Sequence, residues 1–177
     1  MKTKKIYQNI KQMAKALLET SDDGRQFIES FTGDHYLIDG MPKMRGAEIL
    51  AFLDVPKRDR ELWDVVESGI DEDIVRDYAP DDEDLEIHPI RIVYSGRCLT
   101  AYISKSRGVI WLDEEKMAPL PNASYTFLLR TTRTGESYIV VKDGMYTVAA
   151  LTYEIAQDVA PGETLKTRLM QLAGVET

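Results

Sequence analysis

Residues 90–103 read IRIVYSGRCLTAYI, and this stretch decides the predicted fold. Apolar residues recur at every second position before and after Ser95 and Gly96, which form a short turn signal. A two-residue loop at that point fixes the register of a β-hairpin and puts each apolar partner on the same face. The predicted cross-strand pairs are Tyr94 with Arg97, Ile92 with Leu99 and Ile90 with Ala101.

On the C-terminal side of this hairpin, short apolar segments separated by turn signals predict further strands. The turn signals are Thr134-Gly135 and Asp143-Gly144. The predicted strands are 108–112, 125–132 and 137–142, after which Asp143-Gly144 turns the chain into residues 145–147. Together with the hairpin they give an antiparallel meander of about five strands.

Elsewhere the apolar residues recur every three or four positions, which is the period of an amphipathic helix. N-terminal helices are predicted over 3–19, around Phe27, Ile28 and Phe31, over 46–53, and from Pro56 past Trp63 and Val66. The same period through Val148, Leu151 and Ile155, and then through Leu165, Leu169 and Leu172, predicts two C-terminal helices. Because helices and strands are segregated along the chain, the predicted class is α+β.

This pattern divides the 177 residues into three stretches that fit one compact domain. The predicted parts are a mainly helical region at 1–79, an acidic linker at 80–85, and an antiparallel sheet with C-terminal helices at 86–177. No apolar run approaches the roughly 20 residues of a membrane span, and the N-terminus lacks the apolar stretch of a signal peptide. With a single cysteine, Cys98, we expect a cytoplasmic protein without disulfides.

The charge of the chain is concentrated in residues 71–86, which read DEDIVRDYAPDDEDLE and are called the acidic run below. Nine of these residues are acidic and only Arg76 is basic, so the run carries the same charge, −8, as the whole chain. Such a concentration attracts a basic partner or forms a solvated connector. A pI near 4.9 argues against direct binding of nucleic acid, which requires clustered lysine and arginine.

As an interaction surface, the acidic run would imitate a phosphate backbone and occupy the basic groove of a protein that handles nucleic acid. The start of the run has a helical period, and Ile74, Val75 and Tyr78 would add apolar anchors to the charges. The candidate binding residues are Asp71, Glu72, Asp73, Asp77, Tyr78, Asp81, Asp82, Glu83, Asp84 and Glu86.

A second constellation consists of Pro80-Asp81 and the sequence Glu114-Glu115-Lys116 that follows an apolar strand. It resembles the PD-(D/E)xK pattern of restriction-endonuclease-like nucleases. The resemblance covers five residues and departs from the family at Glu115, where an apolar residue is usual. It implies that Asp81 and Glu114 would hold a divalent metal and that Lys116 would help to activate water. The alternative is a surface turn after a strand.

Nucleophilic catalysis by Cys98 finds little support in the predicted register. That register pairs Cys98 with Val93 and puts His88 opposite Ile103, about 16 Å further along the strand. The other histidine, His35, could approach only through tertiary packing. The glycine patterns that bind phosphates are also absent from the sequence.

The sequence therefore favours a non-enzymatic cytoplasmic interaction module or inhibitor, without a metal or cofactor, that binds a basic protein through the acidic run. Neither membrane binding nor direct nucleic-acid binding is expected. The alternatives are a metal-dependent nuclease using Asp81, Glu114 and Lys116, and a structural subunit that associates with copies of itself.

Overall fold

The computed structural model describes residues 15–20, 25–30, 32–38, 57, 64–69 and 72–155, with the backbone alone at 15–20 and 64–69. The strands are β1 (Lys15–Thr20), β2 (Gln26–Ser30), β3 (His35–Leu37), β4 (Asp64–Gly69), β5 (Glu83–Asp84), β6 (Glu86–Tyr94), β7 (Arg97–Ser104), β8 (Gly108–Asp113), β9 (Thr126–Thr131), β10 (Ser137–Asp143), β11 (Tyr146–Leu151) and β12 (Glu154–Ile155). The helical turns are α4 (Glu72–Val75) and the 3-10 turn η1 (Glu114–Met117).

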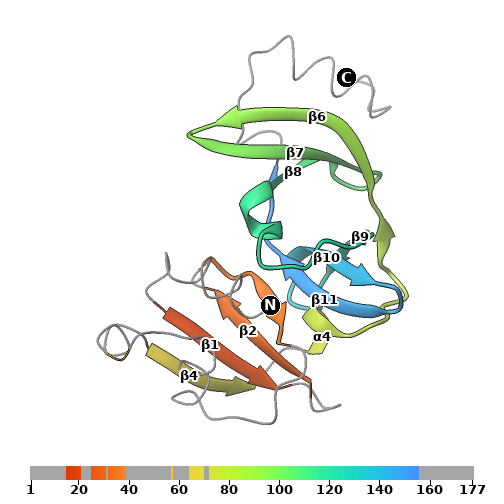
Figure 1. Ribbon diagram of the computed structural model, residues 1–177. Helices are drawn as coiled ribbons and strands as arrows, with labels where there is room; N and C mark the ends of the chain where they lie inside the picture. Colours follow the sequence, from red (N-terminus) through yellow and green to blue (C-terminus); the bar gives the residue numbers. More distant parts are fainter. Residues whose placement is uncertain are drawn as a thin grey trace.

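Within these residues the strands form two sheets. The larger sheet has the order β4-β1-β2-β3-β11-β10-β9-β5, and the smaller has the order β12-β8-β7-β6. All pairs are antiparallel except β1 with β4, which run parallel. Figure 1 shows the smaller sheet at the top, β10 and β11 below it, and β1, β2 and β4 at the lower left.

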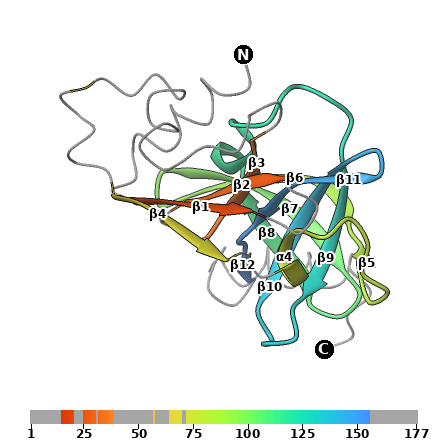
Figure 2. The same cartoon turned by 90° about the horizontal axis from the view of Figure 1, so that it is seen from below.

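The core lies on both faces of the larger sheet. One face packs against the smaller sheet through Ile28, Tyr36, Leu129 and Ile139 on one side and Tyr102, Ile110 and Leu112 on the other. The opposite face is covered by α4, which packs against β10 and β11 and is visible beside them in the view from below (Figure 2). Because both faces of the sheet are covered, consecutive residues of its central strands are both buried. Apolar and polar residues therefore alternate little along these strands.

The predicted α+β class is wrong, since the described residues are mainly strand and their helical structure is limited to short turns. The predicted helix over 3–19 is replaced by β1 from Lys15 onward, and residues 3–14 lie outside the described part. The second predicted helix is β2, which contains Phe27 and Ile28. Residues 64–69 form β4, and β11 stays extended through Leu151. The predicted helices at 46–53 and 165–172 lie outside the described residues.

The hairpin at the centre of the sequence prediction is confirmed. Tyr94 pairs with Arg97 and Ile92 with Leu99, while Ser95 and Gly96 turn with positive φ. The predicted register fails further from the turn, where it shifts between Ile87 and Arg91 and brings Glu86, not His88, opposite Ile103. Pro89 lies in this interval, and its lack of an N–H removes a ladder hydrogen bond.

Strands from both sides of the expected linker share one sheet, because β3 pairs with β11. Part of the expected linker is itself a strand, since Glu83 and Asp84 form β5 and pair with Leu129 and Leu128 of β9. In the described ranges we find no helix with the length and apolarity that a membrane span requires.

Candidate interaction surface

The acidic run crosses the larger sheet and is fastened to it by several of its own carboxylates. Its first described turn, α4, buries Ile74 and Val75, and its last part enters β5. The carboxylates of Asp73, Asp77, Asp82 and Glu83 all have partners within the chain. The run is therefore in large part a structural strap rather than a uniform solvated face.

Arg130 on β9 is the main fastening point of this strap, and its side chain is 1% exposed. Its Nε and Nη2 atoms donate to the two carboxylate oxygens of Asp82 at 2.8 and 2.5 Å. Its Nη1 atom donates to the carbonyl oxygens of Ile74 and Arg76 at 3.1 and 2.6 Å. One buried guanidinium thus binds both ends of the segment between α4 and β5, with the bidentate geometry that only arginine provides.

Asp77 is held at the β10–β11 hairpin. Its carboxylate accepts from the backbone N–H of Thr147 at 2.7 Å and from Arg25 at 2.9 Å. Lys142 donates from Nζ to the carbonyl oxygen of Asp77 at 2.8 Å. Asp77 therefore contacts Lys142 and Thr147, which pair with each other one position from the residues that flank the turn, and this holds the next residue, Tyr78, close to the hairpin.

Two further acids are satisfied internally. Asp73 forms ion pairs with Arg76 at 3.3 Å and with Arg133 at 3.2 Å. Glu83 accepts hydrogen bonds from the backbone N–H groups of Lys105 and Ser106 and from the Ser106 hydroxyl. Because those residues form the β7–β8 turn of the smaller sheet, Glu83 links the two sheets.

The carboxyl group of Glu83 gives a pH-dependent prediction. Burial acts to raise its pKa, but hydrogen bonds from Ser106, Ser104 and the backbone of Lys105 outweigh burial and lower the pKa below the ordinary 4.5. A carboxyl with a lower pKa in the folded state adds stability above its ordinary pKa, and this stability is lost as the pH falls through the folded-state value.

We therefore expect Glu83→Gln to lower the urea midpoint at neutral pH, and this difference from the native chain to shrink progressively below pH 4.5. The matched control is Asp84→Asn, since Asp84 is the exposed neighbour in β5. A difference between Glu83→Gln and the native chain that stays constant with pH would contradict the expectation.

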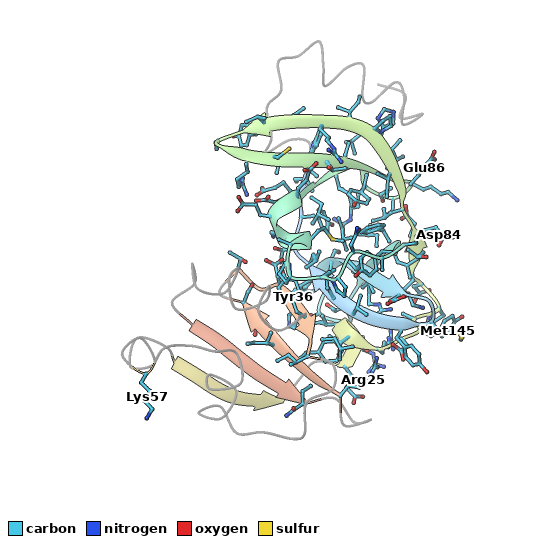
Figure 3. All side chains as sticks on the ribbon, viewed as in Figure 1. Arg25, Tyr36, Lys57, Asp84, Glu86 and Met145 are labelled. Atoms are coloured by element: carbon cyan, nitrogen blue, oxygen red, sulfur yellow. The ribbon has the colours of Figure 1, made fainter. Side chains whose placement is uncertain are left out.

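Four described acids of the run remain exposed: Glu72, Asp81, Asp84 and Glu86. No hydrogen bond or ion pair joins the side chains of Asp81, Asp84 and Glu86 to the part of the chain that the structure describes. Tyr78 is 76% exposed, and the hairpin turn beside it carries Met145 at 81%. Figure 3 shows Asp84, Glu86 and Met145 along the same side of the molecule. Of the other predicted binding residues, Glu72 is exposed at the start of α4, and Asp71 lies outside the described residues.

The nuclease-like constellation is divided among separate partners. Glu114 accepts from Thr100 Oγ1 at 2.6 Å and pairs with Arg91 at 2.9 Å. Lys116 donates from Nζ to Asp34 at 3.1 Å and to the hydroxyl and carbonyl oxygens of Thr152. Asp81 stays exposed in the turn before β5. A search of the described residues finds no group of three or more His, Cys, Asp or Glu side chains that could hold a metal ion.

Cys98 lies opposite Val93, as the register predicts. Burial, followed by a hydrogen bond with Glu114 and its charge, raises the pKa of the Cys98 thiol. These contributions disfavour the thiolate, which is the nucleophilic form. His35 is buried in β3, with its ring edge-on to Tyr138 at a centroid distance of 5.7 Å.

The sequence analysis did not identify two groups of residues that matter in the structure. Met145 and Tyr146 lie at the hairpin turn, and their place was signalled by Asp143-Gly144, a turn dipeptide between two strands. Asp34 is buried as the partner of Lys116, and nothing in the local sequence marks that contact.

Comparison of the chain with models of protein families found no match, and comparisons with curated proteins and with solved structures found none either.

Proposed function

We propose that this chain is a cytoplasmic, non-enzymatic interaction module or inhibitor that binds a basic protein, such as a protein that handles nucleic acid. The observation that supports the proposal is the exposed remainder of the acidic run, in which Asp81, Asp84, Glu86 and Tyr78 are all exposed. Acidic side chains at a rim attract and orient a basic partner, and an exposed tyrosine supplies an anchor. The single cysteine is compatible with a reducing compartment.

The structure also changes which residues the proposal uses. Four carboxylates hold the run to the rest of the chain, those of Asp73, Asp77, Asp82 and Glu83. Because they already have partners within the chain, they are less accessible to a binding protein. They still contribute to the net charge of −8, which acts over a longer range than direct contact. Neutralising the entire run would therefore remove the fold together with the surface and could not test binding.

The test uses a small charge change at exposed positions. The native chain is immobilised and screened against displayed random peptides, and the affinities of selected peptides are measured from low to high ionic strength. We expect peptides rich in lysine and arginine, with binding that weakens steeply as salt rises. Asp84→Asn combined with Glu86→Gln should weaken binding about tenfold.

The control is Glu115→Gln combined with Glu136→Gln, which removes the same charge from exposed positions outside the acidic run. This control should bind like the native chain. Equal weakening by both pairs of substitutions, or selected peptides without basic residues, would refute the proposed surface.

A further inference from the structure

We infer that Tyr78, Met145 and Tyr146 form the apolar centre of this surface, and that it takes a basic protein segment carrying bulky apolar side chains. The inference rests on the proposed function and deepens it by naming the partner chemistry. The three side chains are 76%, 81% and 64% exposed, and they are called the Tyr-Met patch below. Exposed large apolar residues that gather in one place mark interaction sites more often than isolated ones.

The gathering follows from contacts between the backbone segments. Asp77 accepts from the N–H of Thr147, so the residues next to these two, Tyr78 and Tyr146, flank one hydrogen bond of 2.7 Å. Lys142 reaches the carbonyl oxygen of Asp77 from the other strand of the hairpin. Segments distant in sequence are therefore held together at the patch.

The patch is also presented by a fixed framework. Asp143 pairs with Tyr146 across the turn, and Gly144 provides the positive φ of +61° that this turn requires. The hydrogen bonds of Asp77 fasten the other side of the patch to the same hairpin. A preorganised backbone reduces the entropy lost when a partner binds.

The charges around the patch select the partner. Asp81, Asp84, Glu86 and Asp143 are exposed acids on the segments that carry or adjoin the patch. Two cations beside the patch are already bound to Asp77, Lys142 at its carbonyl oxygen and Arg25 at its carboxylate. An apolar centre with exposed acids on the same and adjoining segments matches a segment in which lysine or arginine alternates with apolar residues.

The side chains of the patch suit such a segment. The tyrosine rings accept the apolar stems of lysine and arginine on their faces and attract the cationic ends. Methionine adapts its shape to different apolar side chains, which suits a surface that binds short peptides. The exposed carboxylates then form ion pairs with the cationic ends of those side chains.

The experiment compares two labelled synthetic peptides of equal length and charge, one alternating lysine with leucine and the other alternating lysine with serine. The protein variants are Met145→Ser combined with Tyr146→Ser and, as a control, Val93→Ser. Val93 is 79% exposed on the smaller sheet, so its replacement removes exposed apolar surface at a different place. Binding is measured by fluorescence anisotropy, and circular dichroism verifies that each variant is folded.

We expect the native chain to bind the lysine–leucine peptide at least about tenfold more tightly than the lysine–serine peptide. The double serine variant should remove this preference, while Val93→Ser should retain it. Equal affinity of the native chain for both peptides, or equal loss in the two variants, overturns the inference while leaving the acidic surface intact. Concentration-dependent self-association lost in the double serine variant also overturns it, because a second copy would then be the occupant.

Failure of the proposed function gives a different result. In that case neither peptide binds the native chain, or binding is unaffected by Asp84→Asn combined with Glu86→Gln. The two sets of outcomes distinguish a wrong surface from a correct surface with the wrong apolar centre.

Discussion

Replacing Asp82 with alanine is expected to lower the free energy of unfolding by about 3–5 kcal/mol. The substitution leaves Arg130, whose side chain is 1% exposed, without its bidentate partner. When a buried cation loses its counter-charge, its desolvation penalty remains but the attraction that offset this penalty is lost. Urea unfolding followed by circular dichroism measures the change.

The neighbouring Asp81→Ala is the matched control, because Asp81 is exposed and outside the Arg130 contact. It should change stability by no more than about 0.5 kcal/mol. Combining Asp82→Ala with Arg130→Met should recover part of the loss, since the unpaired charge is then removed. If Asp82→Ala and Asp81→Ala unfold at the same urea concentration, the strap described above does not stabilise the fold.

The second large effect is expected at Asp34, whose carboxylate is 1% exposed. It accepts hydrogen bonds from Thr32 Oγ1 at 2.6 Å and from the backbone N–H of Thr152 at 2.8 Å, and it pairs with Lys116 at 3.1 Å. Asp34→Ala should therefore cost about 3–5 kcal/mol of unfolding free energy, because one substitution removes the counter-charge of the largely buried Lys116 ammonium and leaves the backbone N–H of Thr152 without its acceptor.

Glu115→Ala is the control for this effect, since Glu115 is an exposed acid next to Lys116. It should unfold like the native chain. The same contacts affect any test of the nuclease alternative, in which Lys116→Ala would abolish cleavage. Lys116 supports the fold through Asp34 and Thr152, so a loss of activity has meaning only if the variant is folded at the assay temperature. An unchanged melting temperature in Asp34→Ala would show that this cluster is dispensable.

The strands that sequence analysis predicted are those with a clear period or clear turns. In β6 one face is exposed, so apolar and polar residues alternate and the hairpin can be recognised locally. β2 differs because Phe27 packs on one face of the larger sheet and Ile28 on the other. Ala149, Ala150 and Leu151 of β11 are likewise all buried. Consecutive apolar residues fit a helix as well as a doubly covered strand, so the class was predicted wrongly.

The role of the acidic run was hidden for another reason. Asp82 contacts Arg130, which is 48 residues away in sequence. Asp77 contacts Arg25 and Thr147, which are 52 and 70 residues away. Such contacts depend on strand order, which a charge pattern does not encode. The apolar residues of the run could be singled out from sequence, but their exposure could not: Ile74 and Val75 are buried in α4, and Tyr78 is exposed.

The pairing of β3 with β11 has a consequence for the chain while it is being synthesised. β3 has β2 on one side from early in synthesis, but its other neighbours, Ala149 and Ala150, lie close to the end of the described chain. Until they emerge from the ribosome, the backbone groups on that edge of β3 have no strand to bind, and an open edge can pair with another nascent chain. We therefore expect aggregation to compete with folding in this interval, which ends when β11 pairs with β3.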